Sequence, residues 1–110
     1  MSKFDEKVAG YKANMEKLGI KYDEDKLIAC TKACGPSIYN ADGETVSGSD
    51  QSELDTVKKN YLIKKLGLSE SDDLDAVVNH VIEKMGKSNR NKYRAIFYYL
   101  CSEKVGKFPS

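Results

Sequence analysis

Apolar residues recur at steps of three and four in five separate segments of the chain, and this spacing does most to narrow the folds it can adopt. Between residues 3 and 18 the apolar positions lie on one face of a helix, and they are Phe4, Val8, Tyr11, Met15 and Leu18. Similar spacing follows Asp23 and recurs across residues 50–66, 72–85 and 88–105. Each segment predicts a short amphipathic helix.

Residues that commonly begin or end helices lie near the ends of these five segments. Asp50 and Glu53 have the spacing of a capping box, in which each side chain bonds the other's backbone N–H, and they open the third predicted helix. We expect Ser69 or Ser71 to cap the fourth helix, and the fifth to begin around Ser88 or Asn89. Glycines suited to helix ends follow four of the segments, namely Gly19, Gly35, Gly67 and Gly86.

The segment "GPSIYNADGETVSGSD", residues 35–50, is the longest stretch without helical periodicity, and a few residues around Val46 are the only candidate strand. A chain of 110 residues is the size of one domain. The sequence therefore predicts an all-α fold, a compact bundle of four to five short helices with one irregular loop near residues 35–50. Residues 1–110 should form a single helical domain.

Charge is distributed unevenly although the net charge is only +1. Residues 1–50 carry −2 and residues 51–83 carry −3, whereas residues 84–110 carry seven basic and one acidic side chains, or +6. A second basic cluster lies within the third predicted helix and consists of Lys58, Lys59, Lys64 and Lys65, for which a solvated helix face is the simpler interpretation.

The basic C-terminal segment contains Gly86-Lys87-Ser88, which resembles the end of a phosphate-binding loop. That loop requires a glycine at the position of Val81, so a nucleotide-triphosphatase motif is excluded. A purely structural role also accounts for these residues, because Gly86 can end the fourth helix and Ser88 or Asn89 can cap the fifth. The functional alternative is an anion site at the start of the last helix, formed by Lys87, Ser88, Asn89, Arg90 and Arg94.

The last predicted helix is apolar around much of its circumference, so it should be central in the bundle or contact a partner as well as the core. Tyr98, Cys101 and Val105 form its second stripe and are the candidate surface for a protein partner or for self-association. A DNA-reading helix-turn-helix is disfavoured, because "YRAIFYYL" should be buried beyond its first turn.

Catalytic and metal sites have little support. Cys30, Cys34, Cys101 and the only histidine, His80, are spread over three predicted helices and lack the paired spacing of zinc ligands. Buried reduced thiols account better for the cysteines. We expect no cofactor and no metal, and an enzyme with a site in the 35–50 loop remains the weaker alternative. No membrane span or signal peptide is expected either, because the sequence contains no long apolar run.

Three stretches, "GPSIYN", "NYLIKKLGL" and "MGKSNRNKYRAIFYYL", occur in that order, and with them the chain resembles a family of small bacterial proteins known as domain of unknown function 2853. The resemblance implies an all-helical, single-domain, cytoplasmic bacterial protein and implies no activity, cofactor or catalytic residue. The +6 charge of residues 84–110, and not the resemblance, leads us to expect a non-enzymatic helical binding module whose partner is acidic or bears phosphate.

Overall fold

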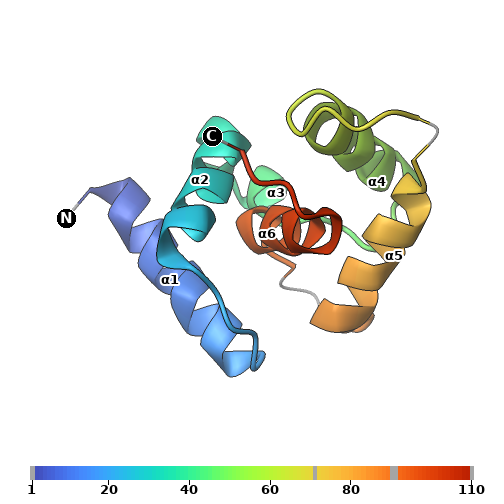
Figure 1. Cartoon of the computed structure of the whole chain (residues 1–110). Coiled ribbons are helices and arrows are strands. Elements are labelled where there is room, and N and C mark those ends of the chain that lie inside the picture. The colour runs from blue at the N-terminus through green and yellow to red at the C-terminus, as the bar shows by residue number, and fades with distance from the viewer. Residues whose placement is uncertain (1, 71, 90–91, 110) are drawn as a thin grey trace.

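The computed structural model describes residues 2–70, 72–89 and 92–109, and it is built from helices (Figure 1). In chain order these are α1 (Lys3–Lys17), α2 (Glu24–Cys34), the 3-10 helix η1 (Gly35–Tyr39), α3 (Ala41–Glu44), α4 (Gln51–Val57), the π-helix η2 (Lys58–Ile63), α5 (Leu74–Met85) and α6 (Arg94–Val105). The described residues contain no strand, only an isolated antiparallel bridge between Thr45 and Tyr93. The predicted all-α fold with four to five main helices is confirmed.

Helix α6 occupies the centre of the molecule. Figure 1 shows α1 and α2 on one side of it and α4 and α5 on the other. Its residues from Arg94 to Ser102 are all buried. A helix that is apolar around most of its circumference must be covered on every side, so the expected central position is confirmed. The surrounding helices produce a body of 41 × 31 × 26 Å.

Aspartates cap most of the helices that surround this centre. Asp23 accepts a bond from the backbone N–H of Lys26 at 3.2 Å and begins α2, as predicted. Helix α5, however, is capped by Asp73, which accepts from the N–H of Ala76 at 3.1 Å. The prediction of a serine cap was wrong for Ser69, which bonds Asp72 through its N–H, and Ser71 lies outside the described residues.

The third predicted helix is α4 continued by the π-helix η2. Its wider turns show in the bond from Leu66 N–H to Tyr61 C=O, which spans five residues at 2.9 Å. The ring of Tyr61 stacks on Tyr98 at 3.9 Å between centroids, and its hydroxyl bonds Ser102 Oγ at 2.6 Å. The extra residue in a turn rotates the following side chains by roughly 100° relative to an α-helix.

The last helix begins later than predicted. Asn89 does not open α6, because its side-chain amide donates to the carbonyl of Met85 at 3.1 Å and so closes the end of α5. Its backbone N–H bonds the carbonyl of Gly86 at 3.0 Å in the same turn. The chain then runs to Tyr93, the residue before α6. Among the described residues between α5 and α6, 86–89, 92 and 93 therefore connect the two helices and do not form a helix start.

Candidate functional site

Two loops face each other across a polar groove of about 880 Å³. One is the irregular segment from Thr45 to Asp50, and the other connects α5 to α6. The uncharged polar side chains of the lining are Thr45, Ser47, Ser49, Asn79, Ser88 and Asn89. The fold thus brings together the two regions that sequence analysis treated as alternative sites.

Backbone contacts hold the two loops side by side. The N–H of Val46 donates to the carbonyl of Lys92 at 2.7 Å, beside the bridge between Thr45 and Tyr93. Val46 is buried in the core and anchors residues 45–50, whereas much of the rest of the predicted irregular loop near residues 35–50 is helical, in η1 and α3. The backbone contacts of Thr45 and Val46 with Lys92 and Tyr93 therefore hold the two sides of the groove together.

Lys92 is the most unusual residue of the groove lining. Its side chain is charged, yet the residue is only 3% exposed. The ammonium donates to the carbonyl oxygens of Asn89 at 2.6 Å and Lys87 at 3.2 Å, and it forms no ion pair with any residue that the structure describes. Burial lowers the pKa of Lys92 because the charged form loses its hydration.

Gly48 allows the lysine to lie this deep. A Cβ atom at this position would be 3.3 Å from Lys92 Cε and 3.5 Å from its Nζ. The side chain of Lys92 therefore passes directly against the opposite loop, and its ammonium lies where both loops meet. The absence of a side chain at Gly48 provides the space.

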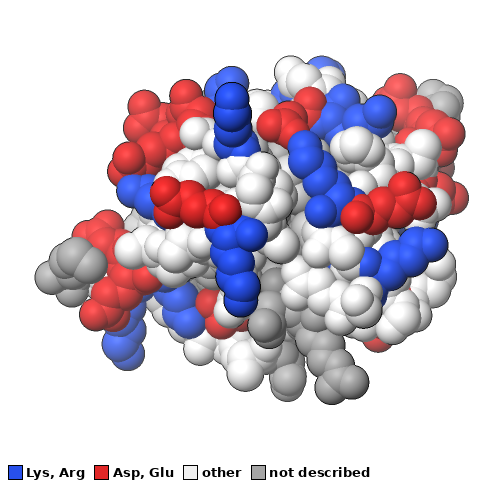
Figure 2. Space-filling view, turned by 90° about the horizontal axis from the view of Figure 1, so that it is seen from below, with Lys and Arg blue, Asp and Glu red and all other residues white. Residues whose placement is uncertain are grey.

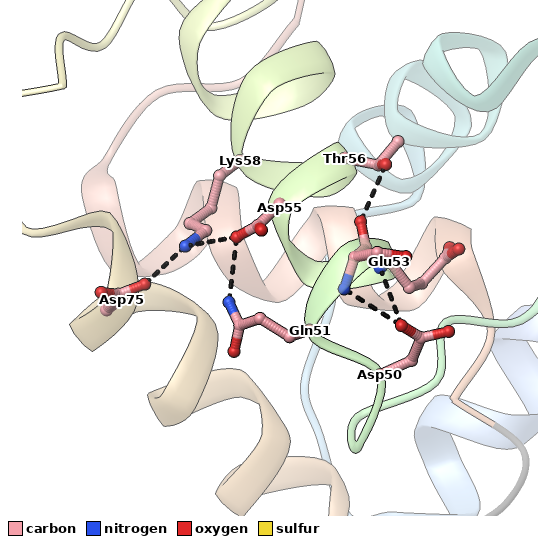
Figure 3. A network of polar contacts seen from close by, with 8 residues as sticks. Asp50, Gln51, Glu53, Asp55, Thr56, Lys58 and Asp75 are labelled. Atoms are coloured by element: carbon pink, nitrogen blue, oxygen red, sulfur yellow. Dashed lines mark hydrogen bonds and ion pairs between the residues drawn. The ribbon is translucent and has the colours of Figure 1, made fainter.

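The two carboxylates of the groove lining are already engaged by the protein. Asp50 caps α4 by accepting from the N–H groups of Ser52 at 3.0 Å and Glu53 at 3.4 Å (Figure 3). Glu53 pairs with Arg94. Only half of the predicted capping box forms, because the N–H of Asp50 bonds the carbonyl of Ser47 at 3.3 Å instead. Among the described lining residues, the charged groups that neither cap a helix nor form an ion pair are therefore the ammonium groups of Lys87 and Lys92.

Arg94 lies in the interior, whereas the sequence placed it with the anion-binding residues. Its Nε donates to the carbonyl of Gly43 at 2.7 Å, Nη2 pairs with Glu53, and Nη1 contacts the hydroxyl of Tyr98 at 3.5 Å. The side chain is 10% exposed. These contacts connect α3, α4 and α6, so they give Arg94 a structural role.

The other predicted anion-site residues divide between the groove and the rest of the chain. Lys87 and Ser88 are exposed and line the groove, and Asn89 lines it while half-buried. Arg90 lies outside the described residues. The backbone N–H groups of Lys87 and Ser88 find no acceptor within the described part of the chain. Three of the five predicted residues thus meet at one place.

The predicted interaction stripe of the last helix faces mostly inward. Tyr98 and Cys101 are buried, and Val105 is half-buried. Tyr98 stacks on Tyr61, and burial raises the pKa of Cys101. A partner could reach only Val105 of the three, because the core of the protein already covers the other two.

The remaining thiols and the histidine are not arranged as a reactive group. Burial raises the pKa of Cys30 to about 11 and that of Cys34 to about 12. Both thiols are therefore protonated, and poorly nucleophilic, at neutral pH. His80 is exposed on α5. Neither cysteine lines the groove.

The tertiary structure disperses much of the C-terminal positive charge. Lys84 pairs with Glu103 at 3.0 Å, and Arg94 is neutralised by Glu53. On the face seen in Figure 2, basic and acidic side chains alternate and uncharged surface separates them. A continuous basic surface of the kind that follows a nucleic-acid backbone is not visible on that face.

Comparison with family models identifies the chain. The model of the family described as "Protein of unknown function (DUF2853)" matches residues 10–109. The protein belongs to the DUF2853 family. No curated protein matches it. In the described part of this DUF2853 protein, no helix has the length and apolar character needed to cross a membrane.

Lys92 is the groove residue that sequence reasoning missed. It follows Asn91 in a run of basic and polar residues, and nothing in the local pattern separates it from exposed neighbours such as Lys87. The available signal was indirect, since a lysine immediately before the apolar run "YRAIFYYL" is close to the core in sequence. Its burial depends on Gly48, which is distant in the chain.

Proposed function

We propose that this DUF2853 protein is a binding module that receives a phosphate-bearing ligand in the groove lined by residues 45–50 on one side and by residues 87–89 and Lys92 on the other. The observation that carries the proposal is the buried ammonium of Lys92, which has carbonyl partners but no carboxylate partner among the described residues. Lys87 supplies a second positive charge at the exposed edge.

The energetic argument concerns the charge of Lys92. A buried charge is costly without a counter-charge, and carbonyl dipoles compensate only part of the lost hydration. A phosphate oxygen entering the groove would provide the opposite charge and form charge-assisted hydrogen bonds, which are shorter and stronger than neutral ones. The ligand thus removes a cost that the free protein bears.

The rest of the lining suits the same ligand. Hydroxyl groups of Ser47, Ser49 and Ser88 can donate to phosphate oxygens, and the N–H groups of Lys87 and Ser88 add backbone donors. Because the groove contains these donors and the thiols are protonated and lie elsewhere, we propose binding as its role and not catalysis. We place this role in the bacterial cytoplasm, where three unpaired cysteines would stay reduced.

The test is a residue-resolved NMR titration with inorganic phosphate at low and near-physiological salt. We expect shifts at residues 45–50 and 86–92 that weaken as salt rises. Lys87→Ala should weaken binding roughly three- to tenfold through loss of one charge-assisted contact. Lys104→Ala, which changes an exposed lysine in the last turn of α6, is the matched control and should bind as the unaltered protein does.

A second measurement follows the ammonium itself. Phosphate should raise the pKa of Lys92 from its lowered value, because the bound anion favours the charged form. A titration that leaves the groove resonances and the Lys92 pKa unchanged would eliminate the phosphate-binding role. Equal weakening by Lys87→Ala and Lys104→Ala would show nonspecific attraction and contradict the proposed site.

A further inference from the structure

A second surface feature lies between α2 and the C-terminal segment. Two hollows of about 370 and 510 Å³ meet there and share Lys65 and Pro109 in their linings. The smaller hollow is bordered by α2, and the larger one by Lys64, Lys107 and Phe108. We call the two together the α2 cleft. It shares no lining residue with the groove described above.

Part of the lining of the smaller hollow is apolar. Ile28, Ala29 and Ala33 line it, and all three are half-buried. Ala29 and Ala33 are neighbours on the surface of α2 because they are four residues apart, and Ile28 lines the same hollow from the position before Ala29. The hollow of about 370 Å³ therefore has apolar lining residues and room for one aliphatic side chain.

The sides of the α2 cleft are basic. Lys32, Lys64, Lys65 and Lys107 line it from three separate segments, and none has an ion-pair partner among the described residues. Among the residues that the structure describes, the only carboxylate in either lining is that of Asp25. The lining of the cleft thus combines a positive net charge with apolar residues.

The π-helix helps to assemble this cluster. Lys58, at the start of η2, pairs with Asp55 and Asp75 at 3.0 and 2.6 Å on the side facing α5 (Figure 3). Lys64 and Lys65, which follow η2, line the α2 cleft instead. The four lysines that formed one basic cluster in the sequence are therefore divided between two surfaces.

The shape and the aromatic contacts favour a peptide over other anions. The ring of Phe108 meets Tyr99 edge-on at 5.3 Å, and the ammonium of Lys26 lies 4.8 Å from its centroid, so the ring is already engaged and is a poor stacking platform for a nucleic-acid base. A lipid surface would need projecting apolar residues, whereas the apolar residues here line a hollow.

We propose that the α2 cleft docks an acidic peptide segment of a partner protein. An aliphatic side chain of the segment occupies the hollow over Ile28, Ala29 and Ala33, and flanking carboxylates face the lysines. Charge complementarity supports this occupant, because four cations surround a single carboxylate. The apolar part of the hollow also requires an aliphatic side chain, which a simple polyanion does not have.

Fluorescence anisotropy with a labelled synthetic peptide, a leucine flanked by glutamates on both sides, tests the docking. We expect saturable binding that the double variant Lys65→Glu/Lys107→Glu weakens at least about tenfold. The matched control is Lys3→Glu/Lys17→Glu, which makes the same change of charge at exposed positions of α1. A peptide with serine in place of leucine should bind roughly tenfold more weakly, because the aliphatic anchor is lost.

Each remaining outcome has a definite meaning. Equal weakening by the two double variants, or equal affinity for the leucine and serine peptides, would overturn the proposal in favour of nonspecific attraction. Equal competition by a single-stranded oligonucleotide would overturn it in favour of a general polyanion site. Concentration-dependent dimerisation abolished by Lys65→Glu/Lys107→Glu would assign the cleft to a second copy of the chain. Lys87→Ala should leave peptide binding unchanged, which separates this test from that of the groove.

Discussion

Replacing Arg94 by methionine is expected to destabilise the protein by about 2–3 kcal/mol. The change removes a guanidinium that contacts Glu53, the carbonyl of Gly43 and the hydroxyl of Tyr98. Removing one partner of a fully buried ion pair costs about 3–5 kcal/mol. The Glu53 side chain is 27% exposed, so water can hydrate the abandoned carboxylate in part and the expected cost is smaller. Methionine keeps the buried aliphatic stem.

The expected loss is a large share of the total stability. A domain of this size has a free energy of unfolding of roughly 5–15 kcal/mol. Urea unfolding followed by circular dichroism should show a lower midpoint with an unchanged slope, and the melting temperature should fall by roughly 10–15 °C. Lys104→Met, at an exposed position of the same helix, is the control and should change stability by less than about 0.5 kcal/mol.

A double-mutant cycle with Glu53→Gln separates the ion pair from the other contacts of Arg94. We expect the two single changes to be non-additive by about 1–2 kcal/mol, because each removes the same interaction. An Arg94→Met variant as stable as the control would refute the structural role. Additive effects would show that the pair with Glu53 contributes nothing and that the contacts with Gly43 and Tyr98 account for the loss.

Two further predictions concern Lys92 and the loop glycines. The lowered pKa of Lys92 means that the unfolded chain holds the proton at pH values where the folded protein has released it. The stability of the unaltered protein relative to Lys92→Met should therefore rise as the pH approaches the ordinary lysine value of 10.5, and a difference independent of pH would contradict this. Gly43→Ala should destabilise by about 1–3 kcal/mol, because its Cβ would lie 2.9 Å from the backbone oxygen of Ser37. Its control is Gly10→Ala, in the interior of α1 with open space around it, which should stabilise by about 0.5–1 kcal/mol in thermal unfolding. Equal effects of the two glycine changes would refute the steric argument.

The helices were predictable because their signals are local. Apolar spacing located all five, and Asp23 and Asp50 begin their helices as expected from neighbouring residues. The start of α6 was misplaced because Asn89 can either begin a helix or close the preceding one, and contact with Met85 decides between them. The pattern of apolar residues does not distinguish these two roles.

The candidate site was predictable only in part. The basic segment indicated Lys87, Ser88 and Asn89, which the structure places in the groove lining, and the irregular loop indicated a second region. Sequence analysis could not show that the two regions line one groove. It also grouped Arg94 with the exposed cations, because the identity of a basic residue does not reveal whether a carboxylate lies beside it.

The sequence by itself determined the all-α architecture and the wide apolar surface of α6, since periodicity and the width of an apolar face act within one helix, and the structure decided for a central α6 over one that also contacts a partner. Only the tertiary structure decided which charges remain without a counter-charge. Glu53 and Arg94 neutralise each other across the fold, whereas Lys92 is buried against Gly48 with carbonyl partners alone. The physical reason is that the pKa of a charged side chain, and whether it has a counter-charge, depend on every group within a few ångströms. Most of those groups come from distant parts of the chain.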